Sequence, residues 1–355
     1  KSMTERNQIM DKTCTKKQGC PCVSQCCAKT GSYQVSGNTA LSMDWDGNAP
    51  SILHSTPLTF RELSIRDRSW MAPILAAEDS LASDGCFGTF YLWGRAYGMT
   101  VADAGDRMIA KYRTEDGLFF SYPAGSNTLK PAVTHMKRLA EQLGQPLLIK
   151  GVTEAQKQCL LAEFPAQFQF EELRDSADYI YEAGTLASLG GKKLHNKRNH
   201  CNRFEQECPD WHFEVLGQEH IEACLALLQS WEDNHEGLES GMPEAEKEAI
   251  LRAFRHYDAL GLTGGVLYAG DRLLAFTFGE PVGRHGFDVR FEKADITVHG
   301  TYQMINREFV RHLLKAYPGL RYINREEDMG MGNLRKAKES YYPAFMLNKY
   351  AARWE

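Results

Sequence analysis

The sequence predicts a two-lobed α/β protein with mixed sheets. At 355 residues the chain exceeds one ordinary hydrophobic core, so two domains or two similar lobes are expected. Hydrophobic residues make up 43% and charged residues 25% of the chain, which is typical of a folded globular protein. The third observation is the order of the patterned segments, because β-α-α-β-β-β-α-β-α occurs twice along the chain. This order predicts an internal duplication at the level of the fold.

The first lobe begins at residue 58, where a sustained pattern begins. Alternating apolar residues around the turn signal Glu115-Asp116-Gly117 predict a pair of strands. Aromatic residues between 87 and 97 are spaced as on a helix that buries one face. The expected strands are 58–65, 108–112, 118–122 and 146–150, and the expected helices are 67–78, 87–97, 129–143 and 154–163. Strand-like residues up to Tyr181 complete this lobe.

The second lobe follows the same order. Gly270-Asp271 joins two apolar runs and suits the positive φ of a hairpin turn. Longer segments with helical periodicity flank this hairpin. The expected strands are 213–216, 264–269, 273–279, 285–291 and 320–324, and the expected helices are 221–232, 244–260, 302–317 and 334–341.

These patterns divide the chain into four segments. Residues 1–57 have no period and are rich in Lys, Gln, Ser, Thr, Asn and Gly, so we expect a disordered or poorly packed tail. Residues 58–182 form the first lobe and residues 213–355 the second. Between the lobes, residues 183–212 are expected to form a basic connecting helix.

The composition favours a cytoplasmic location. No run approaches the roughly 18 apolar residues of a membrane span, and no charged-then-apolar leader is present, so we expect no integral membrane span. Cysteines in the patterned region lack paired spacing, as expected of reduced thiols; they are Cys86, Cys159, Cys201, Cys208 and Cys224. The formal net charge of -5 gives no general attraction for nucleic acid, so contact with a polyanion requires a local basic patch.

Residues 190–204 supply such a patch, with five Lys or Arg and no acidic residue. On a helix, Lys193, Lys197 and His200 lie at i, i+4 and i+7 and share one face. Like charges there repel by roughly a few tenths of a kcal/mol unless an anion neutralises them. This pattern predicts binding of a phosphate that belongs to CoA, a nucleotide or tRNA. The alternative is a solvated basic connector, because charged helix faces are common.

A second group of charged residues begins at Asp288. Alternation along a strand places Asp288, Arg290 and Glu292 on one side of the sheet. Glu292 is then positioned to accept a proton from an attacking amine, unless it forms an ion pair with Arg290 or Lys293. Backbone N–H groups of residues 300–302, at a helix start, are expected to hold an anion.

The third group lies between residues 324 and 343. Three consecutive acids, Glu326, Glu327 and Asp328, leave a strand and are followed by a Gly-rich turn and a basic helix. Part of this pattern is a helix-start signal, because acids favour the positive end of a helix and Lys and Arg the other end. We expect this stretch and the basic connector to face a common cavity.

Other motifs are weaker. The cysteines at 14, 20, 22, 26 and 27 match no Cys-x2-Cys pair of pairs, so reactive thiols in a tail are favoured over a zinc or iron–sulfur site. The segment Asp44-Trp45-Asp46-Gly47-Asn48 resembles the opening of a calcium loop but lacks its Gly and terminal Glu. The chain has no His-Glu-x-x-His, P-loop or Gly-x-Ser-x-Gly motif, so metalloprotease, NTPase and α/β-hydrolase functions have no support.

Four motifs together resemble one family. They are Gly191-Lys192-Lys193 through Arg198, Phe291-Glu292-Lys293-Ala294, Asn324-Arg325-Glu326-Glu327-Asp328, and Leu334-Arg335-Lys336-Ala337-Lys338 through Pro343. In this order they are similar to a family of uncharacterised bacterial proteins that is grouped with the C-terminal domain of phosphatidylglycerol lysyltransferase. The resemblance covers residues 58–355. It implies a tandem duplicated acyl-CoA N-acyltransferase (GNAT-like) fold, in agreement with the repeated order of elements.

Relatives with known chemistry imply an activity. Lipid lysyltransferases and peptidoglycan Fem-type transferases move an aminoacyl group from tRNA to an amine or hydroxyl. The resemblance therefore implies an acyltransferase that uses acyl-CoA or aminoacyl-tRNA as co-substrate, with a small-molecule or peptide amine as acceptor. It implies neither a tightly bound cofactor nor a metal. The alternative is a non-catalytic module that binds a phosphate-bearing ligand.

The resemblance and the chemistry of ester aminolysis assign roles to the motif residues. Glu292 is the expected general base, with Glu326, Glu327 and Asp328 as alternatives. Lys338 is similar to the helix lysine that holds the developing oxyanion in Fem-type enzymes. Tyr341 or Tyr342 is expected to protonate the leaving group. Donor phosphates are assigned to Lys192, Lys193, Lys197, Arg198, Gly300 and Tyr302, and substrate contacts to Arg290, Asn324, Arg325, Glu327, Arg335 and Tyr342.

Overall fold

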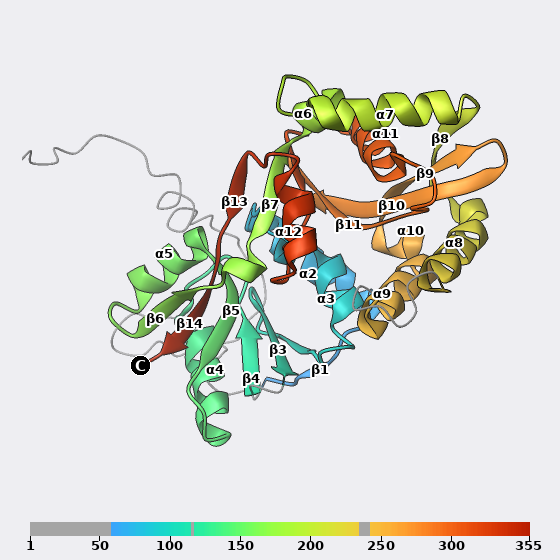
Figure 1. Cartoon of the computed structure of the whole chain (residues 1–355). Helices are drawn as coiled ribbons and strands as arrows, with labels where there is room; N and C mark the ends of the chain where they lie inside the picture. The colour runs from blue at the N-terminus through green and yellow to red at the C-terminus, as the bar shows by residue number, and fades with distance from the viewer. Residues whose placement is uncertain (1–57, 115–116, 234–241) are drawn as a thin grey trace, which may run out of the picture. The chain divides into compact units, whose positions relative to one another are not determined.

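The computed structural model describes residues 58–114, 117–233 and 242–355, and these residues form two sheets (Figure 1). From edge to edge, the first sheet contains β1 (Arg61–Glu62), β2 (Thr100–Asp103), β3 (Met108–Thr114), β4 (Gly117–Ser121), β5 (Leu148–Thr153), β14 (Lys349–Trp354) and β6 (Phe168–Glu172). The second contains β13 (Phe345–Leu347), β7 (Asp178–Glu182), β12 (Tyr322–Asn324), β11 (Gly286–Ala294), β10 (Arg272–Val282), β9 (Thr263–Ala269) and β8 (Trp211–Val215).

Both sheets are mixed. Strand β4 is parallel to β5 in the first sheet, and β11 is parallel to β12 in the second. The other described pairs are antiparallel. The predicted fold class, an α/β protein with mixed sheets, is therefore confirmed.

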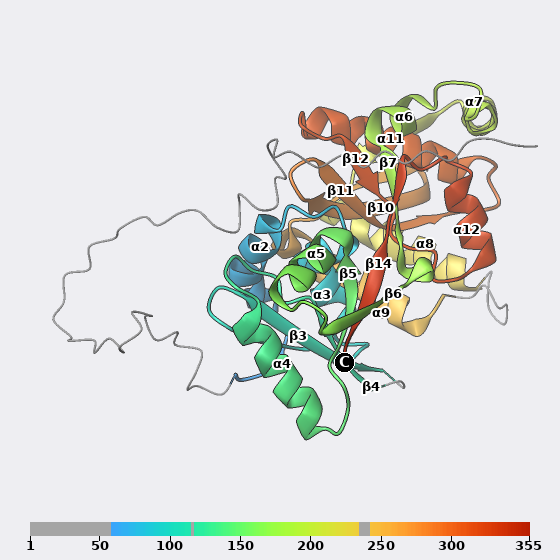
Figure 2. The same cartoon turned by 90° about the vertical axis from the view of Figure 1, so that its left-hand side faces the viewer.

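Helices cover the faces of the sheets, and three apolar clusters form the core. On the first sheet lie α4 (Lys130–Gln142) and α5 (Glu154–Glu163). On the second lie α6 (Ala183–Ser188), α7 (His195–Glu207) and α11 (Thr301–Ala316), as Figure 2 also shows. The third cluster joins β2 and β3 to β9, β10 and β11 through α2 (Arg68–Ala77), α3 (Phe87–Trp93), α8 (Ile221–Asp233), α9 (Glu244–Arg255) and α10 (Tyr257–Leu260). A last helix, α12 (Gly332–Glu339), precedes β13.

The chain passes from the first sheet to the second before β7 and returns to the first sheet at β14. Strand β7 precedes the connecting helices but pairs with β12 and β13 of the second sheet. Strand β14, the last element, returns to the first sheet and lies between β5 and β6 (Figure 1). The first sheet thus contains β14, which lies far in sequence from its other strands, whereas the second sheet consists of the consecutive strands β7 to β13.

Local patterns predicted many elements closely. Helix α5 has the predicted bounds, and α2, α4, α8 and α11 begin or end within one or two residues of theirs. The pairing of Ala269 with Arg272 and the positive φ of Gly270 confirm the predicted hairpin turn.

Other elements differ from prediction. The strand expected at 58–65 is reduced to β1, because a 3-10 turn begins at Ile65 after the N-cap Ser64. The pattern missed β2, β13 and β14. Each has at most six residues, too few for a clear period, so pairing with neighbouring strands determines their conformation.

A buried ion pair ties β14 to β7. The ammonium of Lys349 lies 2.9 Å from Asp178 and 3.0 Å from Asp84, and it donates to the Ser83 hydroxyl at 2.9 Å. Asp178 also accepts from the backbone N–H of Ser83 at 2.8 Å and from Asn324 at 3.0 Å. Opposite charges nearby, Asp178 first, raise the pKa of Lys349 despite its burial. This cluster holds the two sheets together through groups that are 95 to 266 positions apart in sequence.

Removing the cation of this pair should destabilise the fold strongly. In Lys349→Met the carboxylate of Asp178 stays buried without its charge partner, so we expect the free energy of unfolding to fall by about 3–5 kcal/mol. Urea denaturation followed by circular dichroism measures this. The control is Arg353→Met, an exposed position on the same strand, which should change stability by less than about 0.5 kcal/mol. Equal losses in the two variants would contradict the assignment.

Candidate functional site

The predicted functional residues lie on three segments of the second sheet and its helices. Helix α7 and the turn before it carry the basic connector, β11 carries Asp288 to Glu292, and β12 with α12 carries residues 324–342. The structure brings parts of all three together. It does so through two separate groups of charged side chains.

A bulge in β11 separates these two groups. Phe278 of β10 pairs with Phe291 and Gly279 with Val289, so Arg290 has no partner in β10. Val289 packs with the α11 cluster, whereas Phe291 packs with the cluster on the opposite face. A bulge inserts one residue and reverses the alternation of side chains beyond it. The prediction that Asp288, Arg290 and Glu292 share one side of the sheet is therefore wrong, and Glu292 faces α11.

Arg290 and Asp288 belong to the first group, which is buried. The Arg290 guanidinium lies 2.8 Å from Asp288, 3.0 Å from Glu280 and 3.2 Å from Glu326, and it donates to Thr89 at 2.9 Å. One cation thus faces three carboxyl groups. Burial raises the pKa of Asp288 to about 7, although Arg290 acts in the opposite direction. Burial also raises the pKa of Glu280 and of Glu326. The raised pKa values favour the protonated form of these carboxyl groups. The hydrogen bond from Arg290 to Thr89 joins α3 to the second sheet.

Lys338 holds the loop that follows β12. Its ammonium donates to the backbone carbonyls of Arg325, at 2.6 Å, and Glu326, at 3.1 Å, and to that of Glu327. Glu326 has a φ of 56°, in the left-handed region that costs a non-glycine residue about 1 kcal/mol or more. An ammonium has three N–H donors, and here all three bind backbone. Lys338 therefore stabilises this strained loop.

Asp328 also has a full set of partners. It accepts hydrogen bonds from Tyr179 at 2.6 Å, from Arg174 at 3.1 Å and from Arg335 at 2.8 and 2.9 Å. The hydrogen bond from Arg335 is the main reason that the pKa of Asp328 lies well below its usual range. Arg335 and Asp328 thus fix the start of α12. The expected catalytic role of Asp328 and substrate contact of Arg335 stay predictions.

Glu292 belongs to the second group, at the α11 face. Its carboxylate lies 3.0 Å from Arg325 and accepts a longer hydrogen bond, 3.5 Å, from Asn306 of α11. Neither Arg290 nor Lys293 pairs with Glu292. Arg290 pairs with Asp288 in the first group, and Lys293 lies 2.9 Å from Glu246. Burial raises the pKa of Glu292, and Arg325 partly offsets this. A carboxylate with a raised pKa is a stronger proton acceptor than an ordinary carboxylate.

Tyr341 links this carboxylate to the basic connector. Its ring lies 5.1 Å from the Arg325 guanidinium and 4.1 Å from the Lys197 ammonium. Burial raises the pKa of Tyr341, so its hydroxyl keeps its proton. In the same way, Lys193 lies 5.2 Å from the ring of Tyr342. The basic connector and the C-terminal stretch thus meet through cation–π contacts, whereas the expected common cavity stays a prediction.

Lys197 is the least compensated cation of this group. It is half-buried, and within the described ranges no carboxylate pairs with it. Burial, and then the neighbouring Arg325, lower its pKa. An incoming anion would neutralise Lys197 and reduce its repulsion with Arg325. We name Lys193, Lys197, Arg325, Tyr341 and Glu292 the connector site.

The remaining predicted residues lie around this site. Arg198 donates to the carbonyls of Leu189 and, at 2.8 Å, Gly191, so its guanidinium holds the turn before α7. Gly300 is the N-cap of α11 with a φ of 83°, and a side chain there would lie 2.4 Å from the His200 carbonyl oxygen. This close approach requires glycine. Lys192 is exposed.

Three other predicted residues lie away from Lys197. Burial raises the pKa of Tyr302. Asn324 donates to Asp178 and, at 2.8 Å, to the Leu81 carbonyl in the region of the strand-tying ion pair. Burial raises the pKa of Glu327, and Lys349 opposes that shift. The structure does not join these side chains to the connector site by a direct contact in its described part.

Sequence reasoning missed Asn306 and His299. Asn306 is a buried polar residue on the apolar face of α11, and that mismatch was the available signal. His299 lies 2.7 Å from His200, ring nitrogen to ring nitrogen, where α7 approaches the start of α11. Burial, and then His299, lower the pKa of His200. No local pattern indicated this pair, because its members are 99 positions apart.

The described residues contain neither a candidate metal site nor a candidate membrane-spanning helix. Among residues 58–114, 117–233 and 242–355, no three His, Cys, Asp or Glu side chains are grouped so as to hold a metal ion. The cysteine cluster at 14–27 and the calcium-like segment at 44–48 lie outside these residues. In the same part of the chain, every helix is too short or too polar to cross a bilayer.

The comparisons with known proteins support the predicted family. The family described as "Phosphatidylglycerol lysyltransferase, C-terminal" matches residues 77–353. A conserved protein of unknown function from Bacteroides thetaiotaomicron is 34% identical, with a TM-score of 0.77 over 84% of this chain and 100% of that chain. L-PGS from Bacillus licheniformis is 14% identical, with a TM-score of 0.57 over 80% of this chain and 91% of that chain. FemX is 8% identical, with a TM-score of 0.52 over 82% of this chain and 96% of that chain. The last two show that the fold is shared with L-PGS and with a Fem-type protein.

Buried carboxyl groups make a prediction about pH. In the folded protein the pKa of Asp288 is about 7, whereas the ordinary pKa of an aspartate side chain is 3.8. Unfolding therefore releases a proton between these values, and the free energy of unfolding should decrease as pH rises from 4 to 7. In Asp288→Asn the downward slope should lessen by about 1.4 kcal/mol per pH unit.

Chemical denaturation at a series of pH values measures this slope. Asp271→Asn, in an exposed hairpin turn, is the control and should keep the wild-type slope. A slope in Asp288→Asn that equals the wild-type slope would show that Asp288 is ionised in the folded protein.

Proposed function

The chain belongs to the phosphatidylglycerol lysyltransferase C-terminal family, and we propose that it is an acyltransferase that moves an aminoacyl or acyl group from a phosphate-bearing donor to an amine. The donor is an aminoacyl-tRNA or an acyl-CoA, and the acceptor is a small molecule or a peptide. The observation that carries this proposal is the connector site. There an uncompensated cation, Lys197, lies on the same tyrosine ring as Arg325, which pairs with the buried carboxylate Glu292.

The roles follow from what each side chain has available. Lys197 and Lys193 bind donor phosphate, because neither is used in an ion pair with a described residue. Arg325 lies between them and Glu292 and stabilises negative charge that develops on the carbonyl oxygen. This differs from the role assigned by resemblance to Lys338, whose ammonium already binds three carbonyls. Lys338 acts instead as a positioning residue for the Arg325 backbone.

The reaction balances with these groups. The amine nitrogen attacks the carbonyl carbon of the donor ester or thioester, and a C–N bond forms. Glu292 takes the proton that the amine loses. The C–O or C–S bond then breaks, and Tyr341 gives its proton to the leaving oxygen or sulfur. Before the next turnover, Glu292 releases its proton to solvent and the tyrosinate takes one from solvent, while Arg325 stays protonated.

One observation favours a second candidate function. By resemblance to Fem-type enzymes, Lys338 would contact the oxyanion, but its ammonium already donates three hydrogen bonds to backbone carbonyls. The fold is therefore also compatible with a non-catalytic module. Such a module would bind a phosphate-bearing ligand at Lys193 and Lys197 and catalyse nothing. Turnover and affinity, measured separately, distinguish the two functions.

The Glu292→Gln variant tests catalysis. Loss of the proton acceptor should lower turnover by about 10²- to 10⁴-fold and leave donor affinity within about twofold, since the amide keeps the shape of the carboxylate. The donor class is first identified by mass spectrometry of small molecules and RNA that copurify with the full chain. Single-turnover consumption of that donor then gives the rate, and fluorescence titration gives its Kd.

Matched changes on α7 test binding. Lys197→Ala should weaken donor binding about tenfold, and Lys197→Arg should restore most of it, because both retain the helix but only arginine retains the charge. Arg203→Ala, on an exposed turn of the same helix where Arg203 pairs with Glu207, is the control. Absence of turnover with every aminoacyl-tRNA and acyl-CoA, together with intact binding, would establish the non-catalytic module.

Salt dependence separates the two donors. Release of counterions makes tRNA binding through 6–10 phosphates weaken about 10³- to 10⁵-fold between 50 and 200 mM salt. CoA carries few phosphates and should lose much less affinity over that range. Filter binding at several salt concentrations measures the slope of the logarithm of the binding constant against the logarithm of the salt concentration. If tRNA is the donor, Lys192→Ala should reduce the magnitude of this slope by about one. A flat slope would exclude tRNA.

A further inference from the structure

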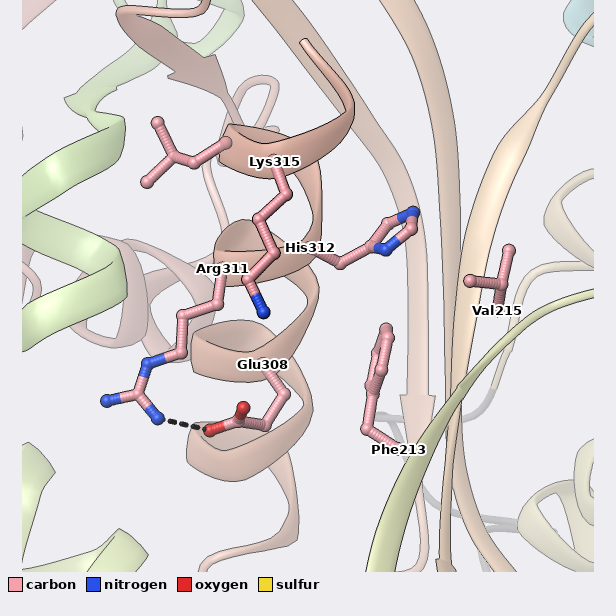
Figure 3. Close-up of a pocket in the computed structure, with 7 residues that line it drawn as sticks. Phe213, Val215, Glu308, Arg311, His312 and Lys315 are labelled. Carbon is pink, nitrogen blue, oxygen red and sulfur yellow. Dashed lines mark hydrogen bonds and ion pairs between the residues drawn. The ribbon is translucent and has the colours of Figure 1, made fainter. Parts of the chain in front are cut away.

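A hollow lies beside the later turns of α11, next to the edge strand β8 (Figure 3). Its volume is about 620 Å³, within the range of roughly 300–1,000 Å³ that is usual for small-molecule sites. It is lined mainly by Phe213 and Val215 of β8 and by Glu308, Arg311, His312 and Lys315 of α11. None of these residues belongs to the connector site. We name this hollow the β8–α11 pocket.

The sequence builds the two walls of the pocket. Residues 308, 311, 312 and 315 recur at i, i+3, i+4 and i+7 and form one face of α11. Phe213 and Val215 are two positions apart and lie on the same side of β8. Phe213 fits closely against β9 because Gly265 has no side chain there; a Cβ atom would lie 2.3 Å from the Phe213 ring. One wall is thus apolar and the other charged.

The charges of the pocket do not cancel. Glu308 pairs with Arg307 at 2.7 Å and with Arg311 at 2.8 Å, and Arg311 also donates to the Ala187 carbonyl at 2.9 Å. Lys315 is exposed, and the structure gives it neither a hydrogen bond nor an ion pair with any residue that it describes. The pocket therefore holds one uncompensated ammonium.

His312 stands between this ammonium and the apolar wall, as Figure 3 shows. Its ring centroid is 5.9 Å from that of Phe213. Burial, and then Lys315, lower the pKa of His312, so at neutral pH it is an uncharged hydrogen-bonding group. A ring nitrogen of His312 and the ammonium of Lys315 can both donate to one anion that rests against Phe213.

We propose that the β8–α11 pocket binds a small organic anion whose carboxylate or phosphate contacts Lys315 and His312, while its aromatic or aliphatic body packs on Phe213 and Val215. A single uncompensated cation suits one anionic group, whereas a nucleic-acid strand needs several. Two sources share this chemistry: nucleoside phosphates and apolar carboxylates. The site is separate from the acyl-transfer chemistry and does not depend on it.

Isothermal titration calorimetry of the full chain with AMP and with octanoate tests this. We expect saturable binding of at least one probe, and the probe that binds identifies the source. Lys315→Gln should weaken that binding about tenfold, the usual effect of losing one charge-assisted hydrogen bond. Lys130→Gln removes an exposed lysine from α4 and should leave Kd unchanged.

A second variant protects the test against loss of folding. Val215 is 50% exposed, so Val215→Asp should fold normally, and its carboxylate should weaken binding at least tenfold by pairing with Lys315 and repelling the anion. Lys197→Ala should bind the probe as the wild type does, which separates this pocket from the connector site. Saturable binding by neither probe, or binding that Lys197→Ala abolishes and Lys315→Gln leaves intact, would overturn the proposal.

Discussion

Buried cations hold this protein together where its segments cross. Arg290, Lys338 and Lys349 are each nine-tenths or more shielded from solvent, and a buried charge without partners costs several kcal/mol. Each therefore fixes the segments that supply its partners. Lys349 ties the last strand to Asp178 of the other sheet, and Arg290 gathers carboxyl groups from β10, β11 and the loop after β12. The return of β14 to the first sheet makes the last of these pairs possible, since it brings Lys349 to Asp178, which is distant in sequence.

This use of charge decides which residues remain for chemistry. Lys338 and Asp328 have the residue types expected of catalytic groups, yet their hydrogen-bonding capacity is taken up by the loop and by α12. Lys197 keeps a charge that no described carboxylate offsets, and Glu292 has a single cationic partner. The bulge at Arg290 is equally important, because it turns Glu292 toward α11 and away from the cluster of acids on the other face. Catalytic potential thus lies with the groups that the scaffold leaves incompletely paired.

Helix α11 connects the two proposed binding regions. Its N-cap, Gly300, allows α7 to pack closely, and Asn306 reaches Glu292. Two turns later, His312 and Lys315 face the β8–α11 pocket. The apolar face of the helix, including Phe309 and Leu313, is fixed in the core of the second sheet. Helix α11 thus contacts the connector site through Asn306 and forms one wall of the β8–α11 pocket.

The sequence by itself determined the fold class, the family and many of the helices and strands. Helix α5 and the hairpin at Gly270 followed from periodicity and turn chemistry, which depend on near neighbours in the chain. The tertiary structure alone decided the pairing of β14, the bulge at Arg290, the His200–His299 contact and the partners of Lys338 and Lys197. Residue type shows that a lysine carries a charge. Whether that charge is already neutralised depends on groups that other elements bring close, as β7 brings Asp178 close to Lys349. A local sequence pattern does not show which distant residues become neighbours in the fold.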